Sequence, residues 1–116
     1  MSRLQQAPVV RVNRFSVPPE ARDEFMKLIQ RTHEVIRAQP GFLDDMILEQ
    51  NAGTETFNLI TILQLEGEHV LQPIIAAVAR SDEAAGIDRQ ALSRSLGVES
   101  SVGFYSPVVL PQLLAA

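Results

Sequence analysis

The chain has 116 residues, of which 46% are hydrophobic, and its formal net charge is −4. This length suits one compact domain and leaves no room for a second, so we expect a single domain over residues 1–116, with a core at about residues 8–109 and a C-terminal tail at residues 110–116. The 10 Lys and Arg residues form no basic stripe, which argues against nucleic acid and against an acidic membrane surface as partners.

The sequence contains no cysteine, which excludes disulfides, a thiolate nucleophile and a cysteine-based metal site. Its first residues lack the apolar core of a signal peptide, and no apolar run approaches the roughly 20 residues of a membrane span. These features predict a soluble, cytoplasmic protein.

The N-terminal part predicts a strand followed by a helix. Residues 9–17, VVRVNRFSV, have the composition of a β-strand, although Asn13 stands where a β-branched residue would fit better. Two prolines then end the pairing, and residues 20–38 carry apolar side chains at the three-and-four spacing of an amphipathic helix.

The middle of the chain predicts a hairpin. Residues 42–50 and 57–65 have strand character and are joined by a turn too short for anything but antiparallel pairing. The second strand, FNLITILQL, is apolar at nearly every position, which indicates a strand covered on both faces.

The C-terminal part predicts helix and then strand. Residues 68–80 form a second amphipathic pattern, in which Pro73 must either kink the helix or begin a new segment. Residues 81–97 are typical of a helical insertion capped by Asp88, and residues 101–109 form the last strand.

The resulting order, β-α-β-β-α-β, is a ferredoxin-like α+β arrangement with two helices on one face of an antiparallel sheet and a helical insertion before the last strand. The other face of that sheet is expected to be apolar, and a monomer would expose it. We therefore expect a homodimer, a dimeric α+β barrel in which the sheets pack face to face and the apolar tail at residues 108–116 lies across the partner.

Four stretches carry a resemblance to a known family: VVRVNRFSVPPE, the helix end RAQPGF, the passage ITILQLEGEHVL and the closing GFYSPV. Over about residues 8–109 the chain resembles the antibiotic biosynthesis monooxygenase domain, a dimeric α+β barrel. Members include cofactor-independent monooxygenases of polycyclic anthrones and quinols, and haem-degrading enzymes. The resemblance implies an apolar aromatic small molecule as partner and no cofactor.

The resemblance also gives Asn13 a role, since an asparagine on the first strand of family members projects into the cleft between sheet and helices and can hydrogen-bond a substrate oxygen. By alternation Asn13 shares a face with Arg11, Phe15 and Val17. The alternative is that Asn13 satisfies a local backbone group at a bulge.

Many members have a tryptophan at the end of the third strand, where this chain has Leu65 and contains no tryptophan at all. Leu65 can wall a pocket but cannot donate an indole N–H, so proton handling falls to other residues. The candidates are His33 on the first helix and His69 at the start of the second. The alternatives are a half-exposed helix histidine for His33 and a solvated one for His69.

The other expected pocket residues are those that wall it or bind substrate. They are Phe15, Thr61, Leu65, Leu71, Ile75 and Tyr105. Tyr105 could instead serve core and interface packing.

No metal site is predicted, because the two histidines are far apart and Asp44 and Asp45 look like a solvated strand start. Haem degradation is less favoured, since His69 falls ahead of where the family's haem ligand is expected.

The sequence therefore predicts a monooxygenase of an aromatic, polyketide or quinol-like small molecule that works without a bound cofactor. Two alternatives stay open: a non-catalytic small-molecule-binding barrel, and an isomerase or cyclase of related substrates.

Overall fold

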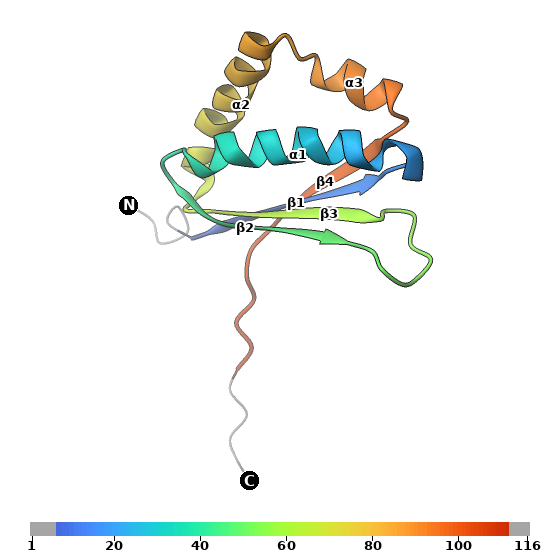
Figure 1. Ribbon diagram of the computed structural model, residues 1–116. Coiled ribbons are helices and arrows are strands. Elements are labelled where there is room, and N and C mark those ends of the chain that lie inside the picture. Colours follow the sequence, from blue (N-terminus) through green and yellow to red (C-terminus); the bar gives the residue numbers. More distant parts are fainter. Residues whose placement is uncertain (1–6, 112–116) are drawn as a thin grey trace.

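A four-stranded antiparallel sheet with helices on one face makes up the protein (Figure 1). The computed structural model describes residues 7–111. The strands are β1 (Val9–Ser16), β2 (Phe42–Glu49), β3 (Leu59–Leu65) and β4 (Glu99–Tyr105), and the helices are α1 (Arg22–Arg37), α2 (Leu71–Ala85) and α3 (Arg89–Ser95). The sheet order β2-β3-β1-β4 confirms the predicted ferredoxin-like α+β fold.

The two central strands present alternate side chains to the helices. Along β3, burial alternates strictly, with Leu59 at 3% and Leu65 at 0% exposure on the helix-facing side. The alternate residues Ile60, Ile62 and Gln64 face away and are half buried, so this chain covers β3 on one face. Cover of its other face by a partner subunit stays a prediction. Each helix-facing residue of β3 pairs with one of β1 that faces the same way.

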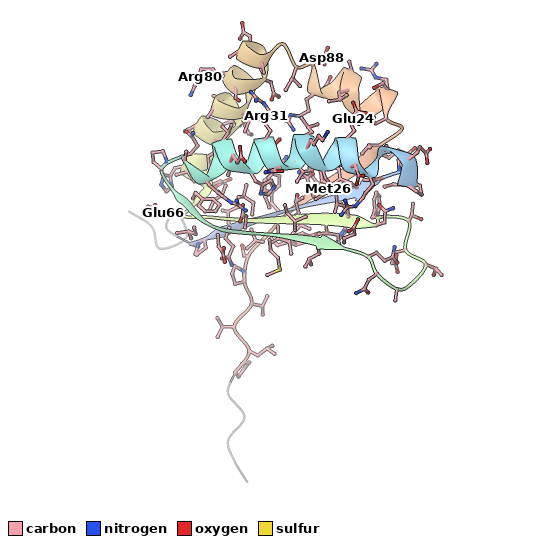
Figure 2. The ribbon with its side chains drawn as sticks, viewed as in Figure 1. Glu24, Met26, Arg31, Glu66, Arg80 and Asp88 are labelled. Atoms are coloured by element: carbon pink, nitrogen blue, oxygen red, sulfur yellow. The ribbon has the colours of Figure 1, made fainter. Side chains whose placement is uncertain are left out.

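Helix α1 lies across the sheet because its apolar stripe matches the helix-facing residues of β1 and β3. Phe25 is 1% exposed and packs edge-on against Phe15, with ring centroids 5.0 Å apart. A 3-10 turn at Pro19–Ala21 leads into α1. Arg31 extends from α1 to α2, where it donates to the backbone and hydroxyl oxygens of Ser81 at 3.0 Å (Figure 2).

Helix α2 follows a 3-10 turn, Glu68–Val70, and continues five residues beyond the predicted end at residue 80. Pro73 falls in its first turn, where no backbone N–H is needed, so no break occurs there. Gly86 ends α2 with a left-handed φ of 69°. The predicted helix cap is confirmed, since Asp88 accepts from the N–H of Ala91 at 3.1 Å.

Strand β4 begins and ends earlier than the predicted residues 101–109. Pro107 cannot donate to a ladder, and the chain after Tyr105 leaves the sheet on the side away from the helices (Figure 1). Val108 is 82% exposed and Val109 90%. The rest of the tail expected to cross the partner, residues 112–116, lies outside the described residues.

The side of the sheet that faces away from the helices is called the outer face here. Its apolar and aromatic residues are Val10, Val12, Met46, Leu48, Ile60, Ile62 and Tyr105, and the polar residues Arg14, Asp44 and Gln64 lie on the same face. Met46 on this face is 53% exposed. Among residues 7–111, no helix has the length and apolar character to cross a membrane.

Candidate functional site

A cavity of about 680 Å³ lies between the helix-facing side of the sheet and the three helices. Its volume is within the usual range for small-molecule sites. Exposed lining residues on α2, α3 and β4, namely Ile75, Arg94 and Ser100, mark its opening. The apolar walls are formed by Phe15, Phe25, Leu28, Ile29, Ile36, Leu63, Leu71, Ile74, Ile75, Val78 and Val98.

Asn13 lies on this cavity, in the centre of the sheet. It pairs with Thr61 of β3 on one side and with Val102 of β4 on the other, and the pairing of β1 runs through it without interruption. The alternative of a bulge therefore has no support. Within residues 7–111 the Asn13 side chain makes no hydrogen bond, and the neighbouring Thr61 is 6% exposed and also lines the cavity. Two polar side chains of the sheet are thus directed into the cavity, between its apolar walls.

His33 also lines the cavity, and it is buried by α1 and β2 rather than half exposed. Its Nδ1 lies 2.9 Å from Oδ2 of Asp45, and the two side chains are only 6% and 9% exposed. An ionised carboxylate can only accept, so Nδ1 donates to Asp45, and in the neutral imidazole Nε2 is then the basic nitrogen.

Asp45 is held in its charged form by two partners. Burial opposes that charge, but hydrogen bonds from Arg37 and His33 outweigh it, and the pKa of Asp45 lies below its ordinary value. Arg37 contributes two of these bonds, at 2.8 and 3.1 Å. The carboxylate therefore orients the imidazole, as an acidic partner does for catalytic histidines generally.

The prediction that Asp44 and Asp45 form a solvated strand start is wrong for Asp45. A register shift between Phe42 and Asp44 sets Asp45 opposite Leu63, on the helix-facing side beneath α1. Asp44 is exposed and faces outward. The signal available in the sequence was the alternation back from Ile47, which shares the inward face with Asp45.

Phe15, Thr61, Leu71 and Ile75 line the cavity, in the positions expected of wall and substrate-binding residues. Their roles remain predictions.

Three expected site residues lie elsewhere. Leu65 is fully buried in a core cluster with Ile36 and Val70 rather than on the cavity. Tyr105 pairs with Val10 and is directed to the outer face. His69 is exposed in the turn before α2 and does not reach the cavity.

Three arginines on the cavity were not predicted as site residues: Arg11 of β1, and Arg89 and Arg94 of α3. Arg89 pairs with the buried Asp82 through two hydrogen bonds of 2.9 Å. Alternation had assigned Arg11 to the face of Asn13, but only the tertiary structure brings α3 over that face.

No group of three or more His, Cys, Asp or Glu residues suited to a metal ion occurs in the part of the chain that the structure describes, residues 7–111.

Comparison with known proteins supports the predicted resemblance. Residues 8–62 match the model of a family described as antibiotic biosynthesis monooxygenase, a segment from β1 into β3 that includes Asn13, His33, Asp45 and Thr61. A search among curated proteins gave no match.

Solved structures share the fold over most of the chain. SnoaB, a cofactor-independent oxygenase from Streptomyces nogalater, is 23% identical with a TM-score of 0.68, covering 91% of this chain and 99% of its own. Rv0793 from Mycobacterium tuberculosis is 17% identical with a TM-score of 0.68, covering 91% and 100%. A variant of MhuD with two manganese protoporphyrin IX molecules per active site is 22% identical with a TM-score of 0.65, covering 90% and 97%.

Proposed function

We propose that the protein is a monooxygenase that oxidises an aromatic or quinol-like small molecule without a bound cofactor. The observation that carries the proposal is the buried pair of His33 and Asp45, in which His33 lines the same cavity as Asn13. The family match over residues 8–62 and the similarity to SnoaB support it.

The chemistry requires a base, an oxyanion partner and a dry space. Nε2 of His33 takes the proton from an acidic C–H or O–H of the substrate, and Asp45 stabilises the imidazolium that forms. The Asn13 amide donates to the substrate oxygen on which negative charge develops. The apolar walls keep water from the carbanion.

The electrons for oxygen come from the substrate. For an anthrone, the carbanion transfers an electron to O₂, and the two radicals combine into a peroxide anion at the former CH₂ carbon. His33 returns its proton to the peroxide, which becomes the hydroperoxide. The remaining C–H bond on that carbon and the O–O bond then break together, one oxygen stays as the new carbonyl, and the other leaves as hydroxide and takes up the released C–H proton to form water. The sum is CH₂ + O₂ giving C=O + H₂O, with no external reductant.

A homodimer is part of the proposal. The outer face carries apolar side chains on β1, β2 and β3, and Tyr105 on β4, and Met46 and Leu48 on it are 53% and 44% exposed. Packing two outer faces together would remove this surface from water. The exposed, apolar residues 108–110 lead away from the same face and are suited to contact the partner (Figure 1).

A non-catalytic binding protein is the second candidate, and Leu65 favours it. Family members with a tryptophan at this position use it as a pocket wall, whereas Leu65 is 0% exposed and contributes nothing to the cavity. Such a protein would bind aromatic ligands in the same cavity without turnover.

Oxygen uptake by the purified protein against a panel of anthrones and hydroquinones, with no cofactor and with a metal chelator, tests the proposal. We expect uptake above the autoxidation rate, and a loss of about 100-fold or more in kcat for His33→Gln. His69→Gln is the matched control, because His69 is exposed and outside the cavity. Equal rates for the wild type and His33→Gln would refute the assigned base. Binding without uptake would favour the second candidate, and product without uptake an isomerase or cyclase.

A further inference from the structure

The cavity lining that the structure describes, drawn from residues 7–111, carries arginines and no acidic residue. Arg11, Arg89 and Arg94 all line it, and only Arg89 is neutralised, by Asp82. Across residues 7–111, neither Arg11 nor Arg94 makes an ion pair. The chain as a whole has a net charge of −4, so the positive charge at the cavity comes from the placement of these arginines and not from the overall composition.

Arg11 is the arginine whose surroundings most need an anion. It projects from the central strand β1, and its Nε is buried with no hydrogen-bond partner among the described residues. Burial, and secondarily the charge of Arg89, lower the pKa of Arg11 below its ordinary value. A buried guanidinium N–H without an acceptor is unfavourable, and an anion bound by the rest of the guanidinium would offset part of that cost by neutralising its charge.

The position of Arg11 relative to Asn13 fixes where such an anion would lie. The two residues are two apart on β1 and face the same way, which separates their Cα atoms by roughly 7 Å. That is about the width of one aromatic ring with its substituent. A molecule held at one end by Arg11 would therefore place its ring beside Asn13, among the apolar walls.

We propose that the ligand of this cavity is an aromatic carboxylate, whose carboxylate group is bound by Arg11 while Arg94 at the opening attracts it. The planar fork of a guanidinium matches the two oxygens of a carboxylate, and the apolar walls suit the ring. The inference deepens the proposed function, on which it rests for the aromatic character of the substrate. It adds that the substrate is an organic anion before any proton is removed.

Calorimetric titration with anthraquinone-2-carboxylate and with its neutral counterpart, anthraquinone-2-carboxamide, tests this. Both are already oxidised, so binding is measured without turnover. We expect the wild type to prefer the carboxylate by about tenfold or more in Kd, the range for hydrogen bonds to a charged group. Arg11→Gln should lose most of that preference, mainly through weaker binding of the carboxylate.

Arg80→Gln is the control, because it removes the same charge from a side chain that points outward from α2 (Figure 2). Its carboxylate preference should equal that of the wild type. Equal affinity of the wild type for the two ligands would overturn the proposal without any variant, and so would a preference that survives in a folded Arg11→Gln protein.

His33→Gln separates this proposal from the proposed function, since it should keep the carboxylate preference while losing oxygen uptake. If the wild type prefers the carboxylate but none of the substrates tested supports oxygen uptake, the proposed oxygenase activity is refuted and the anion site is retained. Uptake without the preference would refute the anion site alone.

Discussion

Replacing Asp45 by asparagine tests the buried pair on which the proposed chemistry depends. The substitution keeps the shape of the side chain but removes the charge that His33 and Arg37 share. A buried hydrogen bond to a charged group contributes about 1.5–3 kcal/mol, and the half-exposed Arg37 adds about 0–1 kcal/mol. We expect Asp45→Asn to lower the free energy of unfolding at pH 7 by about 2–3 kcal/mol.

The effect should depend on pH in a defined direction. Burial raises the pKa of Asp45, but the hydrogen bonds from Arg37 and His33 lower it more, so the folded-state pKa is below the unfolded value of 3.8. The stabilisation by Asp45 is therefore fully present above the unfolded pKa and is lost as the pH falls through the lower, folded pKa. The difference in free energy of unfolding between the wild type and Asp45→Asn should therefore become smaller below pH 3.8.

Urea denaturation followed by far-UV circular dichroism, at one fixed protomer concentration, measures both effects. Asp44→Asn is the matched control, because its exposed carboxylate only accepts from the N–H of Asp45 at 2.9 Å, which an amide oxygen can also do. We expect that control to stay within about 0.5 kcal/mol of the wild type. The assignment of a buried, charged pair would be refuted if both variants lowered the free energy of unfolding equally, or if Asp45→Asn left it unchanged at pH 7.

Two further predictions concern the outer face and the core. Ile62→Lys puts a charge in the middle of the outer face and should convert the proposed dimer to a folded monomer in light scattering; a variant that stays dimeric would place the interface elsewhere. Leu65→Ala should lower the free energy of unfolding, measured in urea, by about 2–5 kcal/mol with little change in ligand affinity, because Leu65 is fully buried and outside the cavity. A large loss of ligand affinity with an unchanged free energy of unfolding would show that Leu65 does form part of the pocket wall.

The sequence was informative about the strands that pair and about Asn13. Alternation in β1 placed Asn13 with Arg11 and Phe15, and the structure has all three on the cavity. It was much less informative about Asp45, because two adjacent aspartates fit either register and the irregularity after Phe42 decides which of them faces inward. His33 was found as a residue type suited to proton transfer, but its carboxylate partner was not.

The C-terminal part was predicted least well. The composition of residues 81–97 indicated helix, and Asp88 and its cap were recognised, yet nothing local shows that α3 returns over the sheet and brings Arg89 and Arg94 to the cavity. The expectation that Leu65 lines the pocket differs from the structure for a related reason. The end of β3 is sealed by α1 and α2 packing over it, and that contact depends on how two helices lie in space.

The sequence by itself determined the secondary structure, through the periodic spacing of apolar residues along the chain. Periods of two and of three to four residues set the elements, and their order limits the sheet to few arrangements, because side chains that alternate must choose one face or the other. Only the tertiary structure decided which distant side chains meet, namely Asp45 with His33 and Asp82 with Arg89, and it leaves Arg11 without an ion pair among residues 7–111. Such meetings depend on the register of strands and the placement of helices, which long-range packing fixes and no local pattern encodes.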